Sequence, residues 1–148
     1  MKQLEGYEKI RLLKDNQKKE IQLKYQEAAG QFEQYATNLY ELLKKKEKIE
    51  ESYKQSLADR SQVETLQSYH QYLDFLTPSI LNTQQKVEKA RKKMNQLQEQ
   101  VTEQYIEVKK IEKIMENKQN EFNQYEKRKD LMFMDELSIR KYSESKDR

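Results

Sequence analysis

The sequence predicts an all-α fold in which two long helices form an antiparallel coiled-coil hairpin, with the second helix longer than the first. Three observations lead to this prediction. Apolar residues recur every seven residues over most of the chain, the 148 residues include only two glycines and one proline, and one short break separates two repeating segments. A repeat of this kind keeps one face of a helix against a partner helix and specifies a left-handed coiled coil.

The longest repeat covers residues 66–125 and predicts the second helix. All of its a positions are apolar: Leu66, Leu73, Ile80, Val87, Met94, Val101, Val108, Met115 and Phe122. Most of its d positions are apolar as well: Tyr69, Leu76, Thr83, Ala90, Leu97, Gln104, Ile111, Lys118 and Tyr125. This apolar stripe, the seam of the coiled coil, requires a partner helix along its whole length.

The first segment carries a second seven-residue register over residues 25–53. Its positions are Tyr25, Ala28, Phe32, Tyr35, Leu39, Leu42, Lys46, Ile49 and Tyr53. Ile21 continues this register upstream, whereas Ile10 and Leu13 lie off it. We therefore expect the register to drift near the N-terminus, with a helix that is frayed or differently packed there. Gly30 falls at an outward position, where we expect a tolerated weak point, with a functional flex point as the alternative.

The break between the two segments predicts a tight turn. Ser61 and Glu64 form a capping-box pattern, in which each side chain satisfies a free backbone amide at a helix start. We expect a helix over residues 4–57, a turn over 58–61, a helix over 62–142 and a disordered tail over 143–148. Because short connections join antiparallel neighbours, residues 1–148 are expected to form one hairpin domain.

Pro78 is the one residue that could divide the second helix. Thr77 and Pro78 could form a helix N-cap and first position, which would start a new helix there. The seven-residue register nevertheless passes through Pro78, which falls at an outward position. We favour a single helix that is kinked at Pro78, where the backbone bond to Asp74 is missing.

The unequal helix lengths predict an unpartnered C-terminal end. At 1.5 Å per residue the first helix spans about 80 Å and the second about 120 Å. The first helix should therefore end near residue 120 of the second. The apolar residues beyond it are Phe122, Tyr125, Leu131, Met132, Phe133, Met134, Leu137 and Ile139. Methionine-rich and aromatic surface of this kind suits protein binding, although a frayed tail that curls back or self-associates is an alternative.

A second exposed apolar patch is expected beside the turn. The outward positions of the second helix are nearly all polar, and the exceptions are Phe75, Pro78, Leu81 and Ile106. Three of these lie within seven residues of one another, with Tyr72 beside them. The pattern is typical of a protein-docking site. The alternative is that a short third helical piece or the hairpin turn covers the patch.

Composition excludes several classes of function. Only 34% of residues are apolar and 37% are charged, with both signs interleaved and a net charge of +3, so no basic stripe for nucleic acid is expected. The chain has no cysteine, and its one histidine, His70, has no catalytic partner. There is no glycine-rich phosphate loop, no signal peptide and no membrane-length apolar run. We expect a cytoplasmic protein without catalytic residues, metal, cofactor or small-molecule ligand.

Four short segments give the chain a family resemblance. Residues 68–73 read Ser-Tyr-His-Gln-Tyr-Leu and are followed by Leu76 and Ile80, and residues 134–137 read Met-Asp-Glu-Leu. Residues 107–110, Glu-Val-Lys-Lys, and residues 39–41, Leu-Tyr-Glu, add to these. With its length and its two unequal helices, the sequence resembles the FliJ family of flagellar type III export proteins, in its Gram-positive branch. The resemblance covers nearly the whole chain.

The resemblance implies a non-enzymatic part of the flagellar export apparatus, cytoplasmic and peripheral to the cell membrane through its protein partners. The family's hairpin is similar to the central stalk of rotary ATPases. Its terminal end inserts into the hexameric ring of the flagellar export ATPase and promotes ring formation and activity. Its turn-side end contacts the cytoplasmic domain of the export gate, and members also bind substrate-specific export chaperones.

The implied sites fall on two groups of residues. The gate-contact stripe falls on Tyr72, Leu76, Ser79 and Thr83, to which the exposed patch adds Phe75. The ring-binding residues are expected to be those of the C-terminal end together with an N-terminal set. They are Ile10, Leu13, Ile21, Phe122, Tyr125, Leu131, Met132, Phe133, Met134, Leu137 and Ile139.

Three other functions remain open at this point. A chaperone or adaptor would use the apolar ends to bind many unrelated apolar clients with similar weak affinity. A structural coiled coil would self-assemble through a seam that Tyr105 and Ile114 broaden at its flanks. A nucleic-acid-binding arm ranks last and would require a steep salt dependence of binding.

Overall fold

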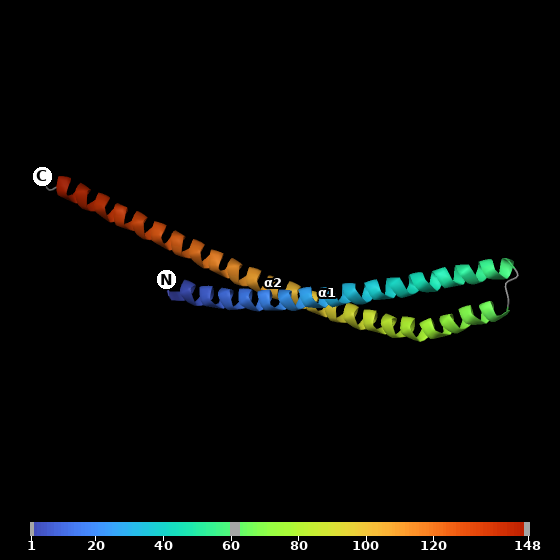
Figure 1. The fold of residues 1–148 in the computed structure, drawn as a ribbon. Helices are drawn as coiled ribbons and strands as arrows, with labels where there is room; N and C mark the ends of the chain where they lie inside the picture. Colours follow the sequence, from blue (N-terminus) through green and yellow to red (C-terminus); the bar gives the residue numbers. More distant parts are fainter. Residues whose placement is uncertain (1, 60–62, 147–148) are drawn as a thin grey trace. The chain divides into compact units, whose positions relative to one another are not determined.

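A computed structural model describes residues 2–59 and 63–146 (Figure 1). Over these residues the chain forms two α-helices, α1 (Lys2–Ala58, 57 residues) and α2 (Val63–Lys146, 84 residues), and no strand. The predicted all-α fold with a longer second helix is confirmed. The amide of Asp59 donates to the carbonyl of Gln55 at 2.9 Å, closing the last turn of α1. Ser61 of the capping box lies outside the described residues.

The C-terminal helix is longer than expected. Residues 143–146 belong to α2, so the disordered tail predicted over 143–148 is wrong as far as Lys146. Residues 147–148 lie outside the described part. The segment Ser-Glu-Ser-Lys contains neither glycine nor proline, so no stop signal ends the helix earlier. Lys146 in the last turn also interacts favourably with the negative end of the helix dipole.

The contacts divide the chain into two compact units. The terminal unit combines Met1–Lys18 with Glu103–Arg148, and the middle unit is Lys19–Thr102. Each unit contains one part of α1 and one part of α2. The expected single domain over residues 1–148 therefore stays a prediction, and the two units are described one at a time.

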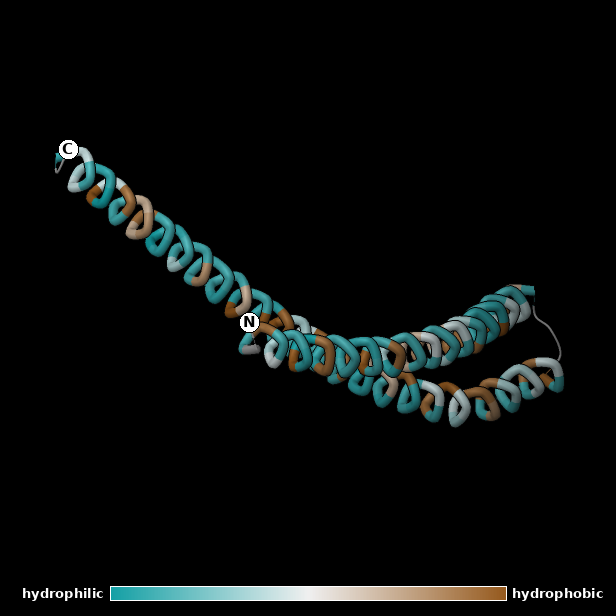
Figure 2. The backbone as a smooth tube through the Cα atoms, turned by 90° about the vertical axis from the view of Figure 1, so that its left-hand side faces the viewer, coloured by the Kyte–Doolittle hydropathy of each residue, from teal (hydrophilic) through white to brown (hydrophobic). Residues whose placement is uncertain are grey.

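In the middle unit, α1 and α2 pack as antiparallel partners. The rings of Tyr53 and Tyr69 lie edge to face at 6.4 Å, and the guanidinium of Arg91 lies 5.6 Å from the ring of Phe32. The residue numbers of each pair add to nearly the same value, 122 or 123. This is expected for antiparallel helices, because a step forward on one helix is matched by a step backward on the other. The buried side chains all lie at predicted seam positions: Ala28, Leu76, Ile80, Val87 and Ala90. Figure 2 shows apolar segments recurring along both helices between hydrophilic ones.

Pro78 lies inside α2, which continues through it without a break. Figure 1 shows a bend in the yellow-green stretch of α2, and by the colour bar this stretch includes the residues around 78. Proline has no amide hydrogen, so the helix bond to the carbonyl of Asp74 is missing there. The hydroxyl of Thr77 donates to the carbonyl of Leu73 at 2.8 Å, a side-chain bond that often accompanies a bent helix.

In the terminal unit, the register of α1 does not drift. Helix α1 begins at Lys2, so of the two expectations for this segment the fraying is wrong, while different packing stays a prediction. The seven-residue spacing continues upstream, and its positions are at most half-exposed: Leu4, Tyr7, Arg11, Lys14 and Lys18. The apolar residues Ile10 and Leu13 are instead 43% and 58% exposed. A continuous helix carries its register onward regardless of which side chains then reach the seam.

Candidate functional site

The C-terminal part of α2, residues 122–146, is an overhang without a partner helix. The seam positions Met115 and Lys118 are half-buried, but Phe122 and Tyr125, the next two, are exposed. All of the predicted apolar residues of the overhang are exposed, including Leu131, Met132, Phe133, Met134, Leu137 and Ile139. The overhang begins here because Leu4, in the first turns of α1, already lies beside Met115 and Gln119.

One turn of the overhang is apolar on every side. Leu131, Met132, Phe133 and Met134 follow one another in sequence and are each 60–69% exposed. Consecutive helical residues point about 100° apart, so four of them cover all sides of the helix. A helix that is hydrophobic all round is normally enclosed by protein or lipid. The turn therefore has the character of a buried element, although none of the residues that the structure describes covers it.

The N-terminal candidates do not form one surface. Ile10 and Leu13 are exposed on α1 in the terminal unit. Ile21 is half-buried at a seam position and belongs to the middle unit. Ile10 and Leu13 are therefore accessible to a partner near the start of the overhang, and Ile21 is a packing residue.

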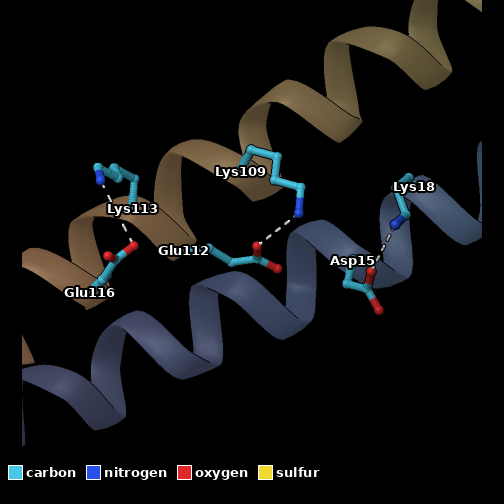
Figure 3. Close-up of polar contacts among 6 residues, drawn as sticks. All are labelled: Asp15, Lys18, Lys109, Glu112, Lys113 and Glu116. Atoms are coloured by element: carbon cyan, nitrogen blue, oxygen red, sulfur yellow. Dashed lines mark hydrogen bonds and ion pairs between the residues drawn. The ribbon is translucent and has the colours of Figure 1, made fainter.

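Charged side chains from α1 join the seam of the terminal unit, which α2 lines with apolar residues such as Val108. Arg11 pairs with Glu8 through two hydrogen bonds, and Lys18 pairs with Asp15 at 3.3 Å (Figure 3). Figure 3 shows Glu112 of α2 directed toward α1 while it pairs with Lys109 at 3.4 Å.

These charges act on one another across the seam. The hydrogen bond from Arg11 lowers the pKa of Glu8, and Glu8 raises the pKa of Arg11, with a smaller contribution from the charge of Glu112. The ammonium groups of Lys18 and Lys109 also lie 5.8 Å and 5.4 Å from the centre of the Tyr105 ring.

A shallow groove of about 480 Å³ lies where α1 begins. Its lining residues are Leu4, Glu5, Glu8, Met115, Glu116 and Gln119. Apolar side chains from both helices thus lie among three carboxylates, directly before the overhang. The groove would suit an apolar or basic side chain of a partner that binds the overhang.

The patch near the start of α2 is exposed as predicted. Phe75 is 71% exposed, and Tyr72 and Leu81 are also exposed. The rings of Tyr72 and Phe75 lie 6.3 Å apart, so the two side chains form one aromatic surface. No described helix covers it. The predicted alternative, a third helical piece over the patch, is absent from the described residues.

The other gate-stripe residues lie closer to the seam. Leu76 is only 4% exposed and packs in the seam. Ser79 and Thr83 are half-buried, and the hydroxyl of Thr83 donates to the carbonyl of Ser79 at 2.8 Å. Both line a polar groove of about 350 Å³ between α1 and α2, together with Asn38, Glu41, Leu42, Lys45 and Asn82. The structure thus divides the predicted stripe into an exposed aromatic part and a recessed polar part.

Two other kinds of site are absent from the part of the chain that the structure describes. No group of three or more His, Asp or Glu side chains in residues 2–59 and 63–146 is placed to hold a metal ion. Within the same ranges no helix is long and apolar enough to cross a membrane. His70 is exposed, and its ring lies 5.5 Å from that of Tyr53, so its contact is an aromatic one.

Sequence reasoning missed several accessible apolar residues. Leu12 and Leu23 are exposed on α1, and Tyr142 is exposed near the end of the overhang. Extending the register of residues 25–53 to the N-terminus would have placed Leu12 on the outside. Tyr142 was passed over because the helix was expected to end at that residue.

The chain was compared with known proteins, and one family matches it. The family model described as Flagellar FliJ protein matches residues 3–147. The chain is similar to the Flagellar FliJ protein of Bacillus subtilis (strain 168), with 35% identity over 136 residues, which is 92% of each chain. No solved structure matches the chain significantly.

Proposed function

The chain belongs to the FliJ family of flagellar export components, and we propose that it is a coiled-coil stalk that couples the export ATPase to the export gate. In this proposal the overhang binds the hexameric ATPase ring and promotes its assembly and activity. The aromatic surface near the start of α2 binds the cytoplasmic domain of the gate. The protein itself carries out no catalysis.

The single observation that supports ring binding most strongly is the turn formed by Leu131, Met132, Phe133 and Met134. Its four side chains are exposed on all sides of an unpartnered helix. A partner docked on one face would cover only part of this surface, whereas the centre of a ring would enclose it completely. Ile10 and Leu13 and the acidic groove beside Met115 would add contacts at the base of the overhang.

Hydrolysis of ATP by the cognate flagellar export ATPase tests this role. The full chain is expected to stimulate hydrolysis and hexamer formation, and a truncation that ends at Glu121 is not. A second variant replaces the four residues of the apolar turn with glutamine, which preserves helix propensity. This variant should also fail to stimulate ATP hydrolysis and hexamer formation. The matched control, Leu23→Gln with Tyr40→Gln, removes equally exposed apolar residues outside the overhang and should retain full stimulation.

Equal stimulation by the truncation would contradict ring binding through the overhang. Lack of stimulation by every chain, including the full one, would contradict the stalk function itself.

The gate-binding part of the proposal rests on exposed residues. Tyr72 and Phe75 form the accessible aromatic surface, and Ser79 and Thr83 border it in the polar groove. Leu76 lies in the seam, so its substitution by a charged residue would weaken the packing of α1 on α2 as well as any contact. Its role in this proposal is to position the residues around it.

Binding to the cytoplasmic domain of the gate is therefore tested with Tyr72→Asp plus Phe75→Asp. We expect binding to be lost while helicity measured by circular dichroism is unchanged, because both side chains are exposed. The control Ile106→Asp changes an exposed residue elsewhere on α2 and should bind normally. Normal binding by the double variant would exclude this surface.

The proposal extends to chaperones and location through family membership. We propose that the protein also binds substrate-specific export chaperones and works at the flagellar base, where protein partners hold it near the membrane. The exposed apolar surfaces also favour a second candidate function, a general chaperone or adaptor. Such a protein would bind unrelated apolar peptides with similar affinity, whereas a stalk should discriminate strongly for its ATPase and gate.

A further inference from the structure

A stripe of the overhang repeats every seven residues. Tyr125, Met132 and Ile139 continue the d positions of the seam and are 60%, 69% and 65% exposed. Side chains seven residues apart lie on the same face of a helix, as in a coiled coil. The overhang therefore presents one coiled-coil stripe in addition to its apolar turn.

The charges on the two sides of Met132 have opposite signs and equal spacing. Arg128 and Lys129 lie four and three residues before Met132, and Asp135 and Glu136 lie three and four residues after it. All four are exposed. Elsewhere on the helices, basic and acidic side chains commonly pair three residues apart, but within the described residues none of these four has an ion-pair partner.

From this arrangement we infer that two copies of the chain pair through their overhangs as an antiparallel dimer centred on Met132. Met132 then lies beside Met132 of the second copy, and Tyr125 lies near its Ile139. The basic pair of each chain meets the acidic pair of the other. The interface is the same on both chains, as two-fold symmetry requires.

The charges select the antiparallel orientation. In a parallel pair in register, Arg128 and Lys129 would lie beside the same basic residues of the second chain, and like charges at an interface oppose binding. In the antiparallel pair all four contacts join opposite charges. Centring on Met132 also places residue 122 of one chain opposite residue 142 of the other, so the pairing uses the overhang and leaves the α1–α2 seam intact.

The dimer is expected to be weak. Residues 122–146 provide only about 37 Å of helix, and exposed ion pairs each contribute little. This inference does not depend on the proposed function, since it concerns only copies of this chain.

Sedimentation equilibrium of the full chain tests the pairing. We expect a reversible monomer–dimer equilibrium that Arg128→Glu plus Lys129→Asp weakens by about tenfold or more, because four attractive contacts become repulsive. Asp135→Lys plus Glu136→Arg should have the same effect. The chain carrying all four changes should dimerise as the natural one does. The matched control, Lys92→Glu plus Lys93→Asp, reverses an adjacent exposed basic pair outside the overhang and should leave the dimer unchanged.

The orientation is tested with cysteines, which the natural chain lacks. A mixture of Tyr125→Cys and Ile139→Cys chains should be joined by a short bismaleimide. Chains that carry only Tyr125→Cys should not be cross-linked, because the two cysteines at position 125 would lie about 21 Å apart in the antiparallel dimer. The inference is overturned by a strictly monomeric chain at concentrations on the order of 100 μM, where even a weak dimer is populated. Cross-linking of Tyr125→Cys alone, or dimerisation unaffected by the charge reversals, would also overturn it.

Discussion

Arg11 illustrates how a charged residue can occupy the seam of a two-helix protein. Its guanidinium bonds to Glu8 on the same helix, and Glu112 of α2 adds an attractive charge. A charge that leaves water is costly unless it is paired, and the seam is thin enough for both partners to stay solvated in part. The α1 side of the terminal seam therefore carries charged residues, whereas α2 brings apolar ones such as Val108 to the same seam.

The carboxyl group of Glu8 should titrate below its ordinary pKa of about 4.5. Because the folded chain lowers this pKa, the Glu8–Arg11 pair contributes stability above pH 4.5, and this contribution is lost as the pH falls through the folded-state pKa. Carbon-detected NMR titration of the side chain checks the value. Arg11→Met should return the pKa toward 4.5, whereas Lys9→Met, beside it in sequence, should not. An unchanged pKa in Arg11→Met would contradict this assignment of the cause.

Gln104 occupies a seam position with an unsatisfied acceptor. Its side-chain oxygen is buried and has no hydrogen-bond partner among the described residues. Gln104→Leu should raise the free energy of unfolding by about 1 kcal/mol, because it removes the unpaired group and adds apolar burial. Urea denaturation measures the change. Gln96→Leu, at an exposed position, should have little effect. A loss of stability in Gln104→Leu would mean that water or a partner satisfies the amide.

At this scale the sequence predicted the seam well in the middle unit and poorly near the N-terminus. The seam residues from Tyr25 to Tyr53 and from Leu66 to Lys118 are all at most half-exposed, as the seven-residue pattern requires. Near the N-terminus, hydrophobicity favoured Ile10 and Leu13, but the continuous helix brought Arg11 and Lys14 to the seam instead. The seven-residue spacing of a continuous helix decides which residues reach the seam there, and a search for apolar residues cannot detect it.

Helix α2 combines three features that the sequence located in advance. It is longer than its partner, it continues through Pro78, and it exposes apolar residues at both ends. The overhang could be predicted because it follows from two lengths and one turn position. The burial of Leu76 and Thr83 also follows from their d positions in the register. The recess around Ser79 could not be predicted, because it depends on how closely α1 packs against α2.

Pro78→Ala should stabilise the hairpin by about 2 kcal/mol, because it restores a backbone hydrogen bond and removes a poor helix former. Gly30→Ala is a useful reference, since a side chain there enters open space and should contribute about 1 kcal/mol without affecting the bend. Urea denaturation of both variants provides the comparison. A less stable Pro78→Ala chain would show that the bend is needed to seat Leu76 and Ile80 against α1.

In the molecule as a whole, we propose different partners for the exposed surfaces, while the seam holds the two helices together. In the proposed function the overhang binds the ATPase ring, and the aromatic surface near the start of α2 binds the gate. If the overhang also pairs with a second copy, ring binding and dimerisation compete for Met132 and its neighbours. The ATPase should then dissociate the dimer, which would keep the apolar turn covered until the ring is available.

The central claim, that the ring encloses the overhang, is tested most directly by photo-crosslinking. A photoreactive amino acid is placed at Leu131, Met132, Phe133 and Met134 in turn, and each full chain is irradiated with the assembled ATPase. The account predicts cross-links to the ATPase from all four positions, because the four side chains point to different sides of one helix. Tyr40, exposed on α1 in the middle unit, serves as the control and should give none. Cross-links from only one side of the turn, or from none of the four positions, would contradict enclosure by the ring.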